Sequence, residues 1–250
     1  MLRCSGVAVR RGEFTLGPIQ VEAMAGEVTA VIGPNASGKT TLLELVAGIT
    51  RPTSGVVELD ETNLHACSVS DRAACVAMLP QRPASELSLS VERLVELGRL
   101  RLTESPEAVE AAIAAFELGP LRHRLVCTLS VGQTQRAHLA RLWAQRDASS
   151  LLVLDEPTAP LDHRWADAVW DMLAAHAGGG GAVVVAVHDL AVAADRADCG
   201  WLLRDGNLVL SGPAGDVFQP DVLGEVFAAG FEWITRRDGS PWLVRGSTPR

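Results

Sequence analysis

The chain has very little lysine. Lys39 is the only one among its 22 strongly basic side chains, and the other 21 are arginines. Arginine can replace lysine on a solvated surface, but not where a compact, flexible ammonium must sit among phosphate oxygens. The scarcity therefore marks Lys39 as a candidate phosphate ligand before any fold is assigned.

Other absences narrow the class of protein. The sequence contains no run of 18 apolar residues, which is about the length needed to span a bilayer. The N-terminus lacks the hydrophobic region of a secretory signal. The five cysteines are scattered without a C-x-x-C pair, so free thiols in a reducing cytosol are expected rather than a disulfide framework or a metal site. The net charge of −8 does not suggest a nucleic-acid surface. A composition with 48% apolar and 21% charged residues indicates a globular chain of one or two domains.

The lone lysine lies in a phosphate-loop pattern, G-x-x-x-x-G-K-S/T, which begins at Gly33. An apolar strand, Val28–Ile32, precedes the loop, and a helix is expected over Thr40–Ala47. An ordinary glycine-rich turn would not need these flanks, whereas strand, loop and helix are the context that this motif requires. The amides of the loop and of the helix start would point at anionic oxygens. Lys39 would hold the β- and γ-phosphates, and the Thr40 hydroxyl would bind Mg²⁺. The candidate phosphate-binding residues are Gly33, Pro34, Asn35, Ala36, Ser37, Gly38, Lys39, Thr40 and Thr41.

The order of hydrophobic patterns predicts an α/β core with a helical insertion. Strand patterns disappear from about residue 83 and return after residue 145. Two later strand pairs are expected to form hairpins through Asp-Gly turns, at 204–207 and at 238–239. Cys75–Leu79 is a short apolar run that ends at Pro80. The predicted strands are Val7–Val9, Phe14–Val21, Val28–Ile32, Val56–Leu59, Leu151–Leu154, Ala182–Val187, Trp201–Leu203, Leu208–Leu210, Phe231–Thr235 and Trp242–Val244. The other predicted helices are Val91–Leu100, Pro106–Leu118, Val131–Gln145 and about 164–177.

Two acids follow the apolar strand at 151–154. Carboxylates at the carboxyl end of a buried parallel strand lie where open α/β sheets bind ligands. Asp155 is suited to hold Mg²⁺ through hard oxygen ligands. Glu156 is suited to orient or deprotonate an attacking water. Behind a phosphate loop, this interpretation is favoured over two solvated acids at a strand end.

Two further polar sites accompany them. Ser130 and Gln133 have capping-box spacing at the start of a predicted helix, where free amides could also meet a phosphate. His188 directly follows the strand that ends at Val187, so it is expected at the same sheet edge as Glu156.

Taken together, these residues resemble the nucleotide-binding subunit of an ATP-binding cassette (ABC) transporter, over about residues 1–215. The resemblance implies that Gln81 is the Q-loop glutamine, which senses Mg²⁺ and the membrane partner. It implies that Ser130–Gln133 is the signature motif, usually Leu-Ser-Gly-Gly-Gln, with Ser130, Gly132 and Gln133 contacting nucleotide. It makes Asp155 a metal ligand, Glu156 the catalytic base, Asp162 part of the D-loop at a dimer interface, and His188 the switch histidine that contacts the γ-phosphate.

Three departures from the family pattern affect the expected chemistry. Val131 replaces the first signature glycine, and a β-branched side chain disfavours positive φ and a close phosphate. Ala36 replaces a usual glycine in the phosphate loop. The aromatic residue that the family stacks on adenine falls near Arg11, which could stack through its guanidinium plane; Phe14 is the nearest aromatic. The three tryptophans Trp143, Trp165 and Trp170 are expected to pack between helices.

The resemblance implies a P-loop ABC ATPase fold with an N-terminal antiparallel β subdomain. The core would cover about 1–82 and 146–215, the helical subdomain about 83–145, and a C-terminal extension about 216–250. Leu89–Arg99 is similar to the segment after the Q-loop in importers of iron chelates, haem and cobalamin, and the extension fits the same group. The expected function is therefore ATP-driven uptake with ATP and Mg²⁺, a second copy of the chain and membrane permease subunits. A substrate-binding protein would take part indirectly, and the expected location is the cytoplasmic face of the membrane. An exporter ATPase and a weakly active regulatory cassette are the alternatives.

Overall fold

A six-stranded sheet forms the centre of the molecule in the computed structural model, which describes residues 1–147 and 150–246. Its strand order is β10-β9-β3-β8-β7-β6, and all neighbours are parallel except the β9–β10 hairpin. Every residue of β3, β7 and β8 is buried, as the unbroken apolar runs of these strands predict. The strands are β3 (Val28–Ile32), β6 (Val76–Leu79), β7 (Leu151–Asp155), β8 (Ala182–Ala186), β9 (Cys199–Arg204) and β10 (Asn207–Pro213).

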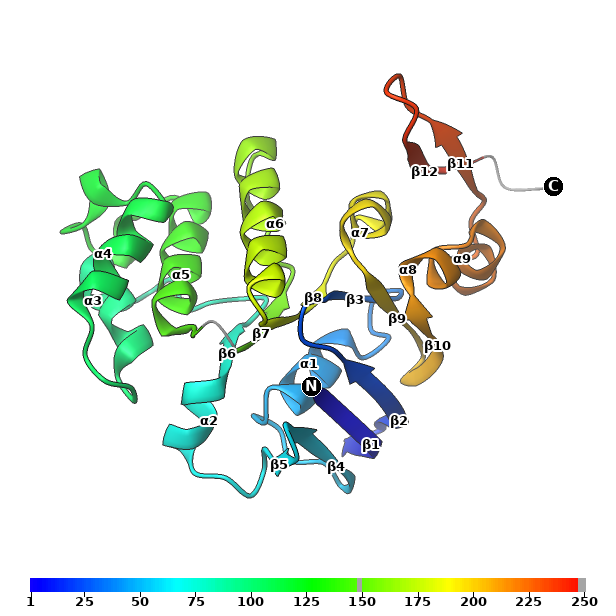
Figure 1. The fold of residues 1–250 in the computed structure, drawn as a ribbon, viewed down its shortest axis with the longest axis horizontal. Helices are drawn as coiled ribbons and strands as arrows, with labels where there is room; N and C mark the ends of the chain where they lie inside the picture. The colour runs from blue at the N-terminus through cyan, green and yellow to red at the C-terminus, as the bar shows by residue number, and fades with distance from the viewer. Residues whose placement is uncertain (148–149, 247–250) are drawn as a thin grey trace.

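An antiparallel sheet of order β2-β1-β4-β5 covers one face of the central sheet, with helix α1 between the two sheets (Figure 1). The inner side chains of both sheets and of α1 form one hydrophobic core, which includes Leu16, Leu42 and Trp201. The strands are β1 (Leu2–Arg11), β2 (Phe14–Ala23), β4 (Ser54–Leu59) and β5 (Thr62–Asn63); α1 is Lys39–Val46.

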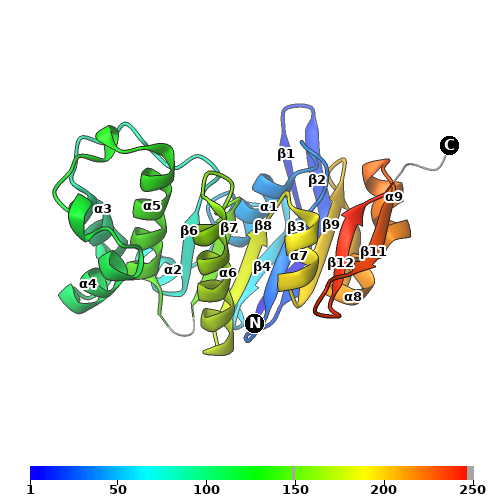
Figure 2. The same cartoon turned by 90° about the horizontal axis from the view of Figure 1, so that it is seen from above.

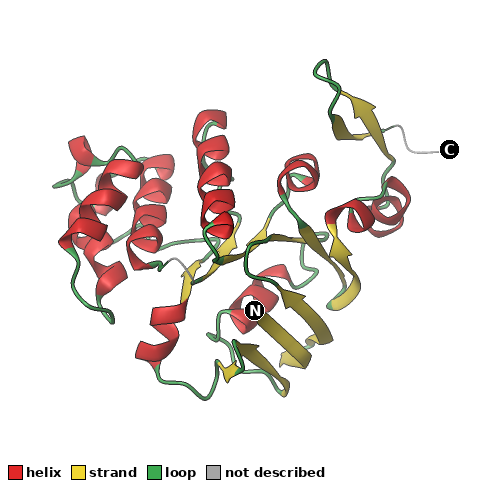
Figure 3. Ribbon diagram, in the orientation of Figure 1, coloured by secondary structure: helices red, strands yellow, loops and turns green. Residues whose placement is uncertain are grey.

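Helices cover the opposite face and build the second core. In Figures 1 and 3, α3, α4 and α5 gather beyond β6, whereas α8, α9 and the β11–β12 hairpin lie at the other end of the sheet; Figure 2 shows the same separation from above. Phe116 lies 6.2 Å from the rings of both Trp143 and Trp165, so these tryptophans pack between helices as predicted. The helices are α2 (Val69–Cys75), α3 (Val91–Glu96), α4 (Pro106–Ala115), α5 (Val131–Gln145), α6 (His163–Gly178), α7 (Leu190–Arg196), α8 (Ala214–Val217) and α9 (Pro220–Phe227). The hairpin strands are β11 (Phe231–Thr235) and β12 (Pro241–Arg245).

The sequence patterns located most long elements correctly, including β3 and α5, whose predicted limits are those observed. They missed α2, α7, α8, α9 and β5, all of eight residues or fewer. The helix predicted over Val91–Leu100 instead ends at Glu96 and continues as a 3₁₀ turn, Leu97–Arg99. A Cβ on Gly98 in this turn would lie 2.2 Å from the Arg141 carbonyl oxygen, so the close approach of α5 requires glycine there.

The predicted subdomain boundaries stay a prediction, and the last four residues of the C-terminal extension, 247–250, lie outside the described part of the chain. Within 1–147 and 150–246, no helix combines the length and the apolar character needed to cross a membrane.

Candidate active site

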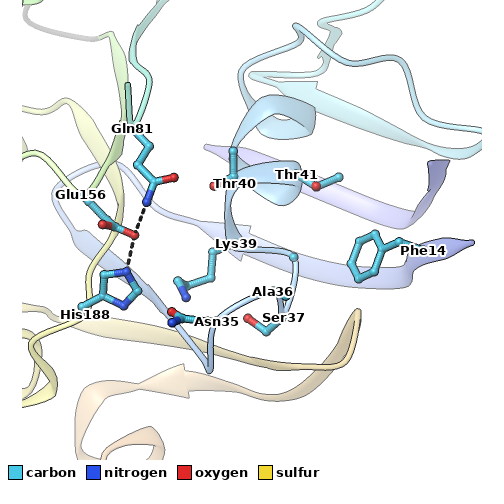
Figure 4. Close-up of a pocket in the computed structure, with 11 residues that line it drawn as sticks. Phe14, Asn35, Ala36, Ser37, Lys39, Thr40, Thr41, Gln81, Glu156 and His188 are labelled. Carbon is cyan, nitrogen blue, oxygen red and sulfur yellow. Dashed lines mark hydrogen bonds and ion pairs between the residues drawn. The ribbon is translucent and has the colours of Figure 1, made fainter. Parts of the chain in front are cut away.

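A cavity of about 610 Å³ opens over the loop between β3 and α1 (Figure 4). Its walls come from β2, from the loop and the start of α1, and from the residues that follow β6, β7 and β8. The ends of parallel strands meet at one edge of the sheet, which is where α/β folds bind ligands. The lining residues are Phe14, Asn35, Ala36, Ser37, Gly38, Lys39, Thr40, Thr41, Gln81, Glu156 and His188.

The loop has the backbone that the phosphate-loop pattern predicts. Gly38 has a φ of +105° directly before α1, and a Cβ there would lie 2.7 Å from the Leu16 side chain. Glycine is therefore required at this position. Ala36 adopts a φ of +61°, a left-handed conformation that glycine adopts without strain and alanine does not. The replacement of the usual glycine thus stores a small strain in the loop.

Lys39 is held within this loop. It is 7% exposed, and its Nζ donates to the carbonyl oxygens of Gly33 at 2.8 Å and Pro34 at 3.2 Å. Burial lowers the pKa of this ammonium, and the nearby carboxylates of Glu156 and Asp155 oppose that shift. A cation aimed into the cavity, with two neighbouring acids, is suited to an anionic ligand that carries its own metal ion.

Thr40 lines the cavity and contacts the buried Asp155, which does not line it. The Thr40 hydroxyl donates to Asp155 Oδ2 at 2.6 Å, whereas the buried Oδ1 has no hydrogen-bond partner. Burial raises the pKa of the Asp155 carboxyl, and the Thr40 hydrogen bond partly offsets the rise. An orphaned carboxylate oxygen beside a hydroxyl fits the hard oxygen donors that Mg²⁺ prefers.

Three residues from three different loops converge above them. Glu156 Oε1 accepts a hydrogen bond from Gln81 Nε2 at 2.9 Å and lies 2.5 Å from His188 Nε2 (Figure 4). The Glu156 side chain is 12% exposed and its φ is +51°, so its backbone sits in a region that costs a non-glycine residue energy. The structure thus brings together Gln81, Glu156 and His188, which are far apart in the sequence.

Arg11 is one of the predicted site residues that do not line this cavity. Its guanidinium lies 2.5 Å from Glu44 Oε2 and 2.6 Å from the Thr50 hydroxyl, and it does not line the cavity. The ion pair with Glu44 occupies the guanidinium that was expected to stack on adenine. Phe14 lines the cavity instead, on the far side of the loop from Glu156 (Figure 4). The contact between Arg11 and adenine stays a prediction, and Phe14 is the aromatic residue that lines the cavity.

The signature residues lie apart from the phosphate-loop cavity of their own chain. Ser130 caps α5, and the capping box with Gln133 is present as predicted. Val131 is 75% exposed as the first residue of α5, and its φ is not positive. Val131 therefore carries no strain from a positive φ, whereas its effect on the approach of a phosphate stays a prediction. Asp162 caps α6 by accepting from the Trp165 amide.

A second cavity, of about 830 Å³, lies between the Gln81 segment and the start of α5. Its lining includes Gln81, Glu86, Val131, Gln135 and Pro160. The sequence patterns did not single out Gln135, or His138 one turn later, yet both are buried on α5. The signal that could have identified these two residues is the occurrence of polar side chains on the buried face of a predicted helix.

Residues 16–159 match the ABC transporter family. The chain is 39% identical over 222 residues to the hemin import ATP-binding protein HmuV of Streptomyces coelicolor, covering 86% of this chain and 79% of that protein. It is 37% identical over 259 residues to the HmuV of Pseudomonas aeruginosa, covering 98% of this chain and 99% of that protein. A metal-chelate type ABC transporter in an inward-facing conformation has the same fold, with a TM-score of 0.80 at 24% identity over 98% of this chain and 97% of that one. A dimeric ATP-binding cassette with bound ADP and Pi has a TM-score of 0.75 at 22% identity, over 86% and 99% of the two chains.

Proposed function

The chain belongs to the ABC transporter family, and on that premise we propose that it is the ATP-hydrolysing subunit of an importer for haem or a related metal chelate. The observation that carries the enzymatic part is the Glu156 carboxylate, held between Gln81 and His188 at the rim of the phosphate-loop cavity. The proposals of import and of haem as the cargo are supported by relatives that are 37–39% identical over most of the chain.

The residues around the cavity have separate roles in phosphoryl transfer. Lys39 exchanges its loop carbonyls for the β- and γ-phosphate oxygens, and the loop amides hold the same charges. Glu156 orients and deprotonates the attacking water, while His188 fixes the carboxylate and contacts the γ-phosphate. Phe14 offers a ring to the base.

Thr40, Asp155 and Gln81 would hold Mg²⁺. The unpartnered Asp155 Oδ1 supports this assignment, as does the Thr40 hydroxyl beside it. When bound, the ion neutralises charge that develops on the phosphate oxygens.

The second half of each site comes from another copy of the chain. Ser130, Gly132 and Gln133 would meet the γ-phosphate in the partner, with Asp162 at the interface. The exposed start of α5 supports this arrangement, since 75% of Val131 faces solvent and none of the signature residues lines the cavity of its own chain. The likeness of the fold to a dimeric cassette is in agreement.

We expect Val131→Gly to raise basal ATP turnover about tenfold, without changing the nucleotide affinity of the monomer. The valine side chain holds the partner's phosphate away from the Ser130 hydroxyl and the Gly132 amide, and charge-assisted hydrogen bonds of this kind contribute about 1.5–3 kcal/mol each. Steady-state turnover and nucleotide titration measure the two effects. Unchanged or slower turnover would make Val131 an accommodated variant.

The regulatory alternative rests on Val131, which is expected to slow turnover, and on the lack of the family's aromatic residue at Arg11. Phe14 lines the cavity and weakens the second of these arguments. The Val131→Gly measurement tests the first. For the exporter alternative, a bacterial ABC exporter has a similar fold but is only 22% identical to this chain. The relatives that import hemin are 37–39% identical to it.

Membrane permease subunits would dock on the segment from Gln81 to Arg99. The cavity of about 830 Å³ that Arg82, Pro83 and Glu86 help to line supports a partner there. On this proposal the chain works at the cytoplasmic face of the membrane, with a substrate-binding protein acting through the permease.

Uptake measurements test this function. Cells that express the chain with its genomically neighbouring permease and binding protein are expected to accumulate haem or chelated iron. Cells with the Glu156→Gln chain in the same complex are expected not to. Equal accumulation with both chains would contradict the proposed role in import.

A further inference from the structure

One face of α5 carries buried polar side chains that bind main-chain carbonyls outside the helix. Gln135 and His138 are 4% and 5% exposed, so each needs a hydrogen-bond partner to offset its desolvation. Arg141 and Gln145 continue the same row toward the end of the helix, where they donate to the carbonyls of Met78, Ala73 and Val76. The helix is therefore tied along its length to the segments around the central sheet.

The two donors nearest the start of α5 reach the loops of the active site. Gln135 Nε2 donates to the Pro157 carbonyl at 2.8 Å, directly after Glu156. His138 Nε2 lies 2.9 Å from the Ala84 carbonyl, three residues after Gln81, and a carbonyl partner makes this nitrogen the donor. Burial lowers the pKa of His138, so the neutral ring supplies this bond.

The two loops also meet each other, because Gln81 Nε2 donates to Glu156 Oε1 at 2.9 Å. The helix α5, the Gln81 loop and the Glu156 loop thus form a closed ring of hydrogen bonds. A displacement of α5 that keeps these bonds would therefore move both loops together.

The partner-facing end of α5 is close to these bonds. Ser130 precedes Gln135 by five residues, about 7.5 Å along the helix axis. This stretch is about 1.4 turns of intact helix and is expected to move as a rigid unit. A phosphate that attracts the start of the helix would therefore also move Gln135.

We propose that Gln135 is a positioning residue that links the two ATP sites of the dimer. A chain that contacts the γ-phosphate of its partner through Ser130 uses Gln135 and the Pro157 carbonyl to set Glu156 in its own site. Gln135 does not line the phosphate-loop cavity and contacts Pro157 rather than Glu156 itself. The inference rests on the proposed dimeric ATPase, and it adds a route by which one site senses the other.

The primary test is Gln135→Met in the full-length chain. Methionine keeps the length and packing of the side chain and removes the donor. We expect kcat for ATP to fall about tenfold with KM within twofold of the native value. The matched control is Gln145→Met, which breaks bonds of the same kind at the far end of α5. It is expected to lower thermal stability at least as much and to leave kcat within twofold.

A double variant separates positioning from a merely structural role. If Gln135 transmits the effect of Ser130, then Ser130→Ala combined with Gln135→Met loses little more turnover than the worse single variant. Losses that multiply would overturn the proposal. It would also be overturned by native kcat in Gln135→Met, or by an equal loss of kcat in the Gln145→Met control.

The proposed function fails in a different way. If the native chain shows no Mg²⁺-dependent ATP turnover, both the proposed enzymatic function and the role of Gln135 are refuted. If the native chain hydrolyses ATP and the Gln135→Met variant is unaffected, only the role of Gln135 is refuted.

Discussion

ATP turnover by the Glu156→Gln variant is expected to fall by a factor on the order of 10² or more, the scale of losing a general base. Glutamine keeps an oxygen for the Gln81 and His188 contacts, so the site retains its shape while losing the group that takes a proton from water. ATP binding is expected to persist. Single-turnover hydrolysis and nucleotide titration measure the two quantities separately.

The trapped variant also tests the composite site. With ATP bound and not hydrolysed, the dimer is expected to accumulate, and sedimentation with saturating ATP and Mg²⁺ would detect it. A monomer under these conditions would count against the second copy as a source of signature residues.

Glu117→Gln is the matched control for this substitution. Glu117 also has left-handed backbone, with a φ of +49° against +51° for Glu156, but it pairs with Arg164 on the surface. The same chemical change there is expected to leave turnover within twofold. An equal loss in both variants would count against Glu156 as the catalytic base, because Glu117 lies outside the site.

Lys39→Ala is expected to weaken ATP binding about a hundredfold or more. Two charge-assisted hydrogen bonds to phosphate oxygens at about 1.5–3 kcal/mol each account for a loss of that size. Lys39→Arg is expected to recover little, because a planar guanidinium cannot replace a point charge between two phosphates. The pocket around the ammonium is also narrow, since Lys39 is 7% exposed between the Gly33 and Pro34 carbonyls. Fluorescent nucleotide titration gives the affinities.

Arg11→Ala serves as the charge-matched control. It removes one positive charge beside the loop, where the guanidinium pairs with Glu44 outside the cavity. Nucleotide affinity is expected to stay within threefold of the native value. An equal loss in both variants would restore Arg11 to the binding site. Near-native affinity in Lys39→Arg would refute the requirement for a compact ammonium.

Local order along the chain was enough to predict the phosphate loop. The loop residues are consecutive, and they act through backbone amides and one flanking helix, so the pattern and its neighbours contain the whole motif. The buried strands could also be predicted from the sequence, because a strand covered on both faces must be apolar throughout. Short helices such as α2 and α7 were not found, since seven residues carry too little periodicity to be distinguished from a loop.

The contribution of single residues to the site depended on side-chain packing that no pattern encodes. Arg11 and Phe14 are three residues apart at a β-turn, and either could have faced the nucleotide. The partner of Arg11, Glu44, is 33 residues away, and that ion pair turns the guanidinium outward. The strained φ of Ala36 likewise follows from the closed loop and not from the identity of its neighbours.

The sequence by itself determined that the chain is an α/β protein with a phosphate loop, a strand ending in two acids and a capped signature helix, because each of these features is local. Only the tertiary structure decided which of them touch. The strand order β10-β9-β3-β8-β7-β6 does not follow the order along the chain, and it brings Gln81, Glu156 and His188 to one edge. The bond from Gln135 to Pro157 spans 22 residues and depends on how α5 packs against the sheet. Contacts of this kind arise from the burial of whole faces, and side-chain identity alone does not specify them.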